Sequence, residues 1–200
     1  ALIGAVTAKQ RNRGKRIIIG ETEHPSVTEA ARHLETLGYQ VVRIPSPRGV
    51  WDMDFYQNAL SPDTILVSAM LVNNETGAVN NISEIARAAK AKNPDVIIHC
   101  DAVQGFLKTE ICPAAYADMV TLSAHKIGGP KGVGALYVNE KILKTRALSP
   151  VIFGGGQERG FRSGTENVIG IAGFGAAASY ALETLSMFLC RAAALRRTLE

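Results

Sequence analysis

Short apolar runs alternate along the chain with stretches in which apolar residues recur every three or four positions. The runs predict buried strands, and the longer period predicts helices that cover them. The predicted strands span residues 16–20, 40–44, 64–69, 96–99, 119–122 and 132–138. Helices are predicted to begin at Pro25, near Asp54, after Asn81 and near Glu166. This order predicts an α/β protein with a three-layer helix/sheet/helix arrangement around a mostly parallel sheet.

Local signals mark the ends of two of these helices. Pro25 suits a first helical position, and apolar residues follow it at helical spacing until Gly38. Asn81 with Glu84 resembles a capping box. Residues 1–6 and 195–200 also have helical patterns. We therefore expect the chain to begin and end inside helices cut from a longer protein.

The most apolar long stretch of the chain is Val168–Leu182. It is too short to span a bilayer and is rich in Gly and Ala, so it is interpreted as a packed helix. Gly170, Gly173 and Gly175 predict that another part of the backbone approaches this helix closely. We expect no membrane partner.

Composition narrows the class of protein. Hydrophobic residues make up 46% of the chain and charged residues 20%, which excludes a disordered protein. The net charge of +4 comes from scattered Lys and Arg, which favours a small anionic ligand over a nucleic acid. The three cysteines, Cys100, Cys112 and Cys190, show no C-x-x-C spacing. They argue against disulfides and a metal site, and fit a reducing cytoplasmic location.

Polar residues follow four of the predicted strands. They are His24, residues 73–75, residues 101–104 and residues 123–126. In an open sheet of parallel strands, the residues just past the carboxyl ends of the strands build the ligand site. We therefore expect these four groups to meet at one edge of the sheet.

Pyridoxal 5'-phosphate needs this set of residue types. The Lys126 amine can form its Schiff base, and the Asp101 carboxylate can keep the pyridine nitrogen protonated. The remaining tasks are contacts to the ring oxygen, to the phosphate and to the face of the ring. Asn74 and Gln104 can bind the ring oxygen, Ser123 and His125 can bind the phosphate, and His24 can stack on the ring.

Each of these residues also has an ordinary interpretation. A lone Lys is usually a surface residue, an Asp after a strand is often a helix cap, and His24 before Pro25 can be one too. His33 and His99 have no partner at ligand spacing, which indicates structural roles. The combination of residues, rather than any single member, predicts the cofactor site.

Two glycine-rich segments have different interpretations. Residues 128–134 lack the order of a nucleotide-binding phosphate loop and run into a strand, so they are interpreted as a turn. Residues 154–165 carry two Arg and two hydroxyl side chains just before a predicted helix, a position that favours an anion.

At the level of motifs, the chain resembles the cysteine desulfurases, the NifS-like branch of the class V aminotransferase family. The matching segments lie in the family's order over nearly the whole chain. They are Thr22-Glu23-His24-Pro25-Ser26-Val27, Val72-Asn73-Asn74-Glu75-Thr76-Gly77, Asp101-Ala102-Val103-Gln104, Ser123-Ala124-His125-Lys126 with the glycines after it, and residues 154–167. The resemblance implies the large domain of the fold type I aminotransferases over residues 1–185. Residues 186–200 would begin the connection to a small domain.

The resemblance also implies a reaction and roles for residues. L-Cysteine would become L-alanine, and its sulfur would pass as a persulfide to iron–sulfur cluster assembly or thiolation, through a sulfur-acceptor or scaffold protein. Lys126 would hold the cofactor and move the substrate proton, and His24, Asn74, Asp101, Gln104, Ser123 and His125 would bind the cofactor. The family is a homodimer, so Thr165 would reach the phosphate of the neighbouring subunit.

Several parts of the family pattern fall outside the chain. Two of them would follow Glu200, namely the catalytic cysteine and the arginine that binds the substrate carboxylate. A small Gly/Thr turn that binds phosphate would precede Ala1. None of the three cysteines of the chain matches the catalytic one. The 200 residues alone are therefore expected to be inactive. The alternatives are another class V pyridoxal phosphate enzyme, such as a selenocysteine lyase or an aminotransferase, and a non-catalytic fragment.

Overall fold

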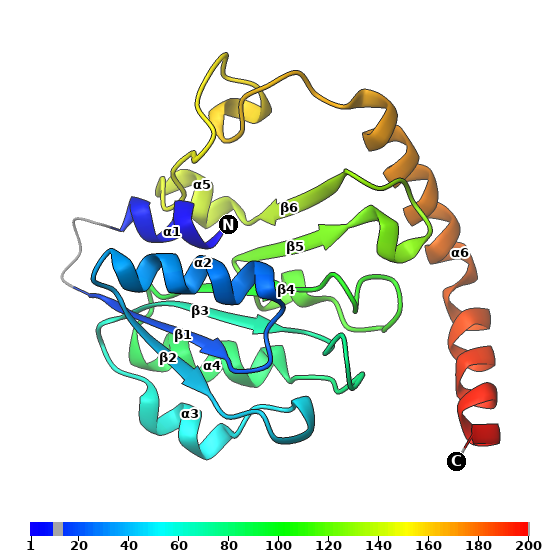
Figure 1. The fold of residues 1–200 in the computed structure, drawn as a ribbon, viewed down its shortest axis with the longest axis horizontal. Coiled ribbons are helices and arrows are strands. Elements are labelled where there is room, and N and C mark those ends of the chain that lie inside the picture. The colour runs from blue at the N-terminus through cyan, green and yellow to red at the C-terminus, as the bar shows by residue number, and fades with distance from the viewer. Residues whose placement is uncertain (10–13, 200) are drawn as a thin grey trace.

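The computed structural model describes residues 1–9 and 14–199. Within them, one six-stranded sheet has the order β2-β1-β3-β4-β5-β6 (Figure 1). The strands are β1 (Arg16–Gly20), β2 (Gln40–Ile44), β3 (Thr64–Met70), β4 (Ile97–Asp101), β5 (Met119–Ser123) and β6 (Gly134–Val138). The first five pair in parallel, and β6 pairs with β5 in the antiparallel direction. The predicted mostly parallel sheet is confirmed.

Helices cover both faces of this sheet. They are α1 (Leu2–Ala8), α2 (Pro25–Thr36), α3 (Met53–Ala59), α4 (Ile82–Lys92), α5 (Glu140–Lys144) and α6 (Val168–Leu199). Among the described residues, four 3-10 turns connect parts of the chain: η1 (Pro47–Gly49), η2 (Pro113–Ala115), η3 (Ala124–Ile127) and η4 (Glu158–Gly160).

A hydrophobic core lies on each face of the sheet, and alternating side chains of β1 point into one core or the other. Ile18 packs in the core that the sheet shares with α3 and α4. Ile17 and Ile19 point the other way, into the core with α1, α2 and α5. Successive residues of a strand face opposite sides of a sheet, so one strand contributes to both cores. The predicted three-layer helix/sheet/helix arrangement is confirmed.

Helix boundaries agree with the chemistry of their first residues. The His24 side chain accepts a hydrogen bond from the backbone N–H of Ser26 and so caps α2, which begins with Pro25. Asn81 caps α4 by accepting from the backbone N–H of Glu84, as the capping box predicts. The five-residue α5 was not predicted, because it is too short to show a helical period.

The long helix α6 differs from the sequence prediction. It lies beside the edge at which β1, β3, β4 and β5 end, and it contacts η3 (Figure 1). The helix predicted over Val168–Leu182 is present, but its packing is more limited than expected, because its buried residues are Gly170 and Phe174. With 32 residues it is also long and apolar enough, by length and composition, to cross a membrane. Core helices of soluble proteins share this property, so it assigns no location by itself.

Small residues allow α6 to approach η3. A Cβ atom on Gly173 would lie 3.1 Å from Pro130, and one on Gly129 would lie 3.2 Å from the Cβ of Ala177. A close approach at Gly173 is therefore present, but the neighbour is the side chain of Pro130 rather than the predicted backbone. At Gly175 the prediction is wrong, because a Cβ there would meet no described atom within 4 Å.

Candidate functional site

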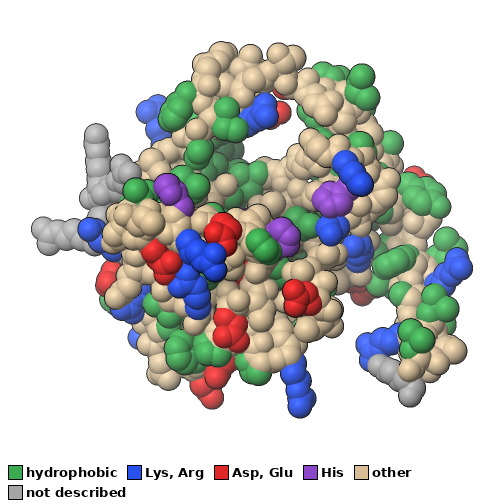
Figure 2. All heavy atoms as spheres, viewed as in Figure 1, with side chains coloured by type: hydrophobic (Ala, Val, Ile, Leu, Met, Phe, Trp, Pro, Cys, Tyr) green, Lys and Arg blue, Asp and Glu red, His purple; other side chains and the backbone are tan. Residues whose placement is uncertain are grey.

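The carboxyl ends of four neighbouring parallel strands meet at one edge of the sheet. Strands β1, β3, β4 and β5 are adjacent in the sheet order, and a predicted site residue follows or ends each of them. At this edge, near the end of β5, Figure 2 shows a histidine side chain next to lysine or arginine side chains. The topology thus brings seven of the eight predicted residues to one edge: His24, Asn74, Asp101, Gln104, Ser123, His125 and Lys126.

His24 is exposed at the start of α2, just beyond the end of β1. Its Nδ1 accepts the backbone N–H of Ser26 at 3.2 Å and lies 2.9 Å from the Ser26 hydroxyl. A backbone N–H can only donate, so Nδ1 is the acceptor and the ring hydrogen lies on Nε2. The capping interpretation of His24 is confirmed, and the cap fixes the orientation of a ring that remains exposed.

Asp101 ends β4 and is 5% exposed. Its Oδ1 accepts the backbone N–H of Val103 at 3.0 Å. Burial raises the pKa of Asp101 above its ordinary value, while the hydrogen bond from the Val103 N–H acts in the opposite direction. A buried carboxylate with few partners favours a cationic group beside it.

Asn74 lies in a turn that is stabilised by the side chain of its neighbour Asn73. The buried Asn73 accepts hydrogen bonds through Oδ1 from the backbone N–H groups of Glu75 and Thr76, at 3.0 and 2.9 Å. Its Nδ2 donates to the carbonyl of Thr22 at 3.2 Å, in the segment that carries His24. Asn74 itself is exposed. The sequence analysis grouped Asn73 with Asn74 but gave it no role.

Lys126 lies half-buried in η3, directly after β5. Ser123 Oγ lies 2.8 Å from Nδ1 of His125 in the same segment. A second lysine, Lys108, lies close enough for the two charges to interact. Burial, and then the positive charge of Lys126, lower the pKa of Lys108. Lys108 also donates a hydrogen bond to Oε1 of Gln104 at 3.3 Å. Sequence reasoning missed Lys108, because it lies in an irregular segment outside the recognisable motifs.

Thr165 lies away from the other seven residues. It is exposed in the segment before α6 and lines a cavity of about 800 Å³, which β6, α1 and residues 148–167 also line. None of the other seven is among the described residues that line this cavity. Just after Thr165, Asn167 Oδ1 accepts the backbone N–H of Gly170, so a side chain of the chain itself caps the start of α6, where the sequence predicts a position that favours an anion.

Sequence reasoning also missed a buried polar chain beneath the strand ends. The ring of His99 lies between Ser68 Oγ, 2.8 Å from Nδ1, and Thr121 Oγ1, 2.7 Å from Nε2. Burial lowers the pKa of His99 to about 3, so the ring is neutral. This chain joins β3, β4 and β5, and it confirms the structural role predicted for His99.

The buried cysteine, Cys100, is poorly suited to act as a nucleophile. Cys100 is fully buried in β4, and burial raises the pKa of its thiol, which keeps it protonated. Cys112 and Cys190 are exposed, and all three are free thiols. Cys100 therefore packs as a small hydrophobic side chain.

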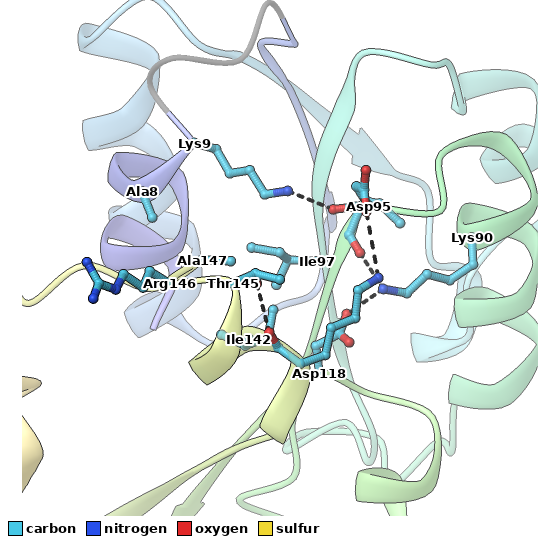
Figure 3. A pocket seen from close by; sticks show the side chains of 12 residues that line it. Ala8, Lys9, Lys90, Asp95, Ile97, Asp118, Ile142, Thr145, Arg146 and Ala147 are labelled. Carbon is cyan, nitrogen blue, oxygen red and sulfur yellow. Dashed lines mark hydrogen bonds and ion pairs between the residues drawn. The ribbon is translucent and has the colours of Figure 1, made fainter.

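A second cavity, of about 290 Å³, lies at the amino end of β4, the opposite end from Asp101 (Figure 3). Its lysines have partners within the chain. Lys90 donates to Asp118 at 2.7 Å and to the carbonyl of Val96 at 2.6 Å, and Lys9 donates to the carbonyl of Asp95 at 2.9 Å. Because these cations already have partners, we assign this cluster a structural role.

Comparison with known proteins gives the same family throughout. The family model described as aminotransferase class V matches residues 1–195. The cysteine desulfurase IscS of Anaeromyxobacter dehalogenans is 45% identical over 190 residues, which cover 94% of this chain and 46% of that protein.

Two solved structures share the fold. A NifS-like protein has a TM-score of 0.87 and 37% identity, over 93% of this chain and 50% of its own. The structure of SspA in complex with cysteine has a TM-score of 0.80 and 36% identity, over 89% of this chain and 51% of its own.

The chain thus spans about half the length of the proteins that it matches. The family model and the relatives together cover nearly all of the described residues, and they agree with the resemblance seen in the motifs. The chain therefore belongs to the class V aminotransferase family, in which its relatives are the IscS- and NifS-like cysteine desulfurases.

Proposed function

We propose that the chain is the cofactor-binding part of a cysteine desulfurase that uses pyridoxal 5'-phosphate. The observation that carries the proposal is the convergence of seven residues of the right chemistry at four neighbouring strand ends. The donor set fits this cofactor. It offers a buried carboxylate, a half-buried lysine, amide side chains, and a serine–histidine pair.

Each side chain has a task in this proposal. Asp101 holds the proton on the pyridine nitrogen, and the exposed ring of His24 stacks on the cofactor. Asn74 and Gln104 bind the ring oxygen, while Ser123 and His125 bind the phosphate. When bound, pyridoxal phosphate supplies an electron-withdrawing ring that stabilises negative charge on the substrate's α-carbon. The amine of Lys126 anchors the cofactor and moves the proton of that carbon.

The proposed reaction converts L-cysteine to L-alanine and leaves its sulfur as a persulfide on an enzyme cysteine outside residues 1–200. The SspA structure with cysteine supports this substrate. The sulfur then serves iron–sulfur cluster assembly or thiolation through an acceptor or scaffold protein. We further propose a homodimer, in which Thr165 reaches the phosphate of the neighbouring subunit. The three free cysteines support a cytoplasmic location.

The test traps the cofactor on its lysine. Full-length protein loaded with pyridoxal phosphate is reduced with borohydride, and the labelled peptide is identified by mass spectrometry. We expect the label on Lys126, and we expect Lys126→Ala to lose the label, the visible absorption band and sulfide release from L-cysteine. Lys108→Ala is the matched control and should keep the label. A label that stays in Lys126→Ala, on Lys108 or another lysine, would contradict the proposal.

A further inference from the structure

The side chain of Glu23 is buried between two parts of the candidate site. It is 7% exposed, and its Oε1 accepts the backbone N–H of Met70 at 2.7 Å. Met70 is the last residue of β3 and lies opposite Asp101 in the pairing of β3 with β4. The carboxyl group therefore links the segment that carries His24 to the residue beside Asp101.

The surroundings of Glu23 leave it little freedom. A Cβ atom on Gly20 would lie 3.1 Å from Glu23 Oε1 and 2.5 Å from Nε1 of Trp51, so the end of β1 needs a glycine. The carbonyl of Met70, whose N–H donates to Glu23, accepts from Nδ2 of the buried Asn80 at 2.9 Å. The backbone N–H and C=O of Met70 are thus each bound by a side chain.

The second oxygen of the carboxyl group, Oε2, is buried and has no hydrogen-bond partner among the described residues. An ionised carboxylate with an unsatisfied oxygen is unfavourable in such a place. Burial, together with the charge of Asp101, raises the pKa of Glu23 to about 8, against the opposing effect of the hydrogen bond from the Met70 N–H. Glu23 is therefore a neutral acid near neutral pH, and Asp101 remains the carboxylate available to a cation.

We propose that Glu23 is a positioning residue, whose carboxyl group fixes the His24 segment against the end of β3 and so holds His24 in register with Asp101. The inference rests on the proposed function, because it assigns the ring-stacking and nitrogen-binding tasks to those two residues. Glu23 acts through the backbone of Met70 and through its own segment. It belongs to the motif Thr22-Glu23-His24-Pro25, in which the sequence analysis gave a role only to His24.

The first arm of the test measures the link without cofactor. Hydrogen–deuterium exchange of peptides that contain the Met70 amide is followed in the full-length apoprotein. Loss of one hydrogen bond to a buried group should speed exchange of this amide about tenfold in Glu23→Ala, whereas Glu23→Gln keeps an oxygen acceptor and should exchange like the parent protein. Glu21→Ala is the control, because Glu21 Oε1 accepts a different backbone N–H, that of Ser46, at 2.7 Å.

The second arm measures cofactor binding and the visible absorption spectrum across pH. We expect Glu23→Ala to weaken affinity for pyridoxal phosphate about tenfold or more and to shift the pH at which the band changes, as for the loss of one buried polar contact. Glu23→Gln and Glu21→Ala should stay close to the parent protein in both. If Glu23→Ala does not fold, Glu23→Asp replaces it, because its shorter side chain does not reach Met70.

The two arms separate the possible failures. A parent protein that forms no adduct on Lys126 overturns the proposed function, while the exchange arm still tests the link. A parent that binds cofactor, together with folded Glu23→Ala or Glu23→Asp variants of unchanged affinity and spectrum, overturns the positioning role. A Glu23→Gln variant as impaired as Glu23→Ala also overturns it, because the proposed contact needs only an acceptor oxygen.

Discussion

Ser123 and His125 hold each other by a hydrogen bond, with 2.8 Å between the serine Oγ and the histidine Nδ1. Both are proposed phosphate ligands, so each also orients the other. We predict that Ser123→Ala and His125→Ala each lower affinity for pyridoxal phosphate about tenfold to a hundredfold, the size expected for a hydrogen bond to a charged group.

The double variant of this pair should lose less affinity than the product of the two single losses, because partners in one hydrogen bond are energetically coupled. Titration of the full-length apoprotein with cofactor gives the four affinities of the cycle. Ser83→Ala, on α4, is the control and should bind like the parent protein. Strictly multiplicative losses would show that the two residues act independently.

Replacement of Asp101 tests the charge on the ring nitrogen. Asp101→Asn keeps the size of the side chain and removes its negative charge, so turnover of L-cysteine should fall about a hundredfold, as when one preorganised electrostatic group is removed. Asp52→Asn, at the exposed cap of α3, should leave turnover unchanged, because Asn caps a helix as well as Asp. Equal kcat in Asp101→Asn and the parent would remove Asp101 from the proposed mechanism.

Two buried groups set how stability depends on pH. The pKa of Glu23 rises from 4.5 to about 8 on folding, so the folded state keeps a proton that the unfolded chain releases. Stability from this group is therefore present below pH 4.5 and is lost as pH rises to about 8. The pKa of His99 falls from 6.5 to about 3, so its contribution is present above pH 6.5 and is lost as pH falls. The two effects oppose each other between pH 4.5 and 6.5.

We therefore predict that the full-length apoprotein loses stability between pH 6.5 and 8, where Glu23 acts without opposition from His99. One proton corresponds to a slope of about 1.4 kcal/mol per pH unit at most. Chemical unfolding at several pH values in this interval measures the slope. Glu23→Gln should flatten it, and an unchanged slope in that variant would assign the pH dependence to other groups.

Asn80 joins three segments and should be a major determinant of stability. Its Oδ1 accepts the backbone N–H of Trp51 at 3.0 Å, and its Nδ2 donates to the carbonyls of Met70 and Gly49, at 2.9 and 3.4 Å. Asn80→Ala leaves buried backbone groups without partners and should cost about 3 kcal/mol.

The adjacent Asn81 offers a matched comparison for that variant. It is exposed and caps α4, so Asn81→Ala should cost about 1 kcal/mol. Denaturant unfolding of both variants measures the difference. Similar losses for the two would mean that the environment of Asn80 relaxes to satisfy the freed groups.

Much of the fold was predictable because the strands are short and strongly apolar. Residues 16–20 and 40–44 were predicted as strands and are strands with those bounds. Parallel pairing follows from the alternation of strands with helices, and the edge at which His24, Asp101 and Lys126 meet follows from parallel pairing.

Other features depend on contacts that sequence periodicity does not encode. Glu23 has the pattern of a surface residue before a helix, and its burial is set by Met70 and Trp51, which are distant in the sequence. Lys108 reaches Gln104 and Lys126 from an irregular segment. The exposure of α6 was not predicted, because an apolar helix has the same composition whether or not something covers it. The domain boundary at residues 185 and 186 stays a prediction, and α6 runs across it without interruption.

The position of β1 in the sheet has a consequence for the speed of folding. It pairs with β2, which follows it closely, and also with β3, so that Ile18 lies beside both Val42 and Val67. The second pairing forms only after α2, β2 and α3 have been synthesised and placed. Distant parallel pairings form slowly, because the entropy of closing the intervening loop is lost before the contacts form. During synthesis, the side of β1 that pairs with β3 therefore stays unpaired until β3 has been made.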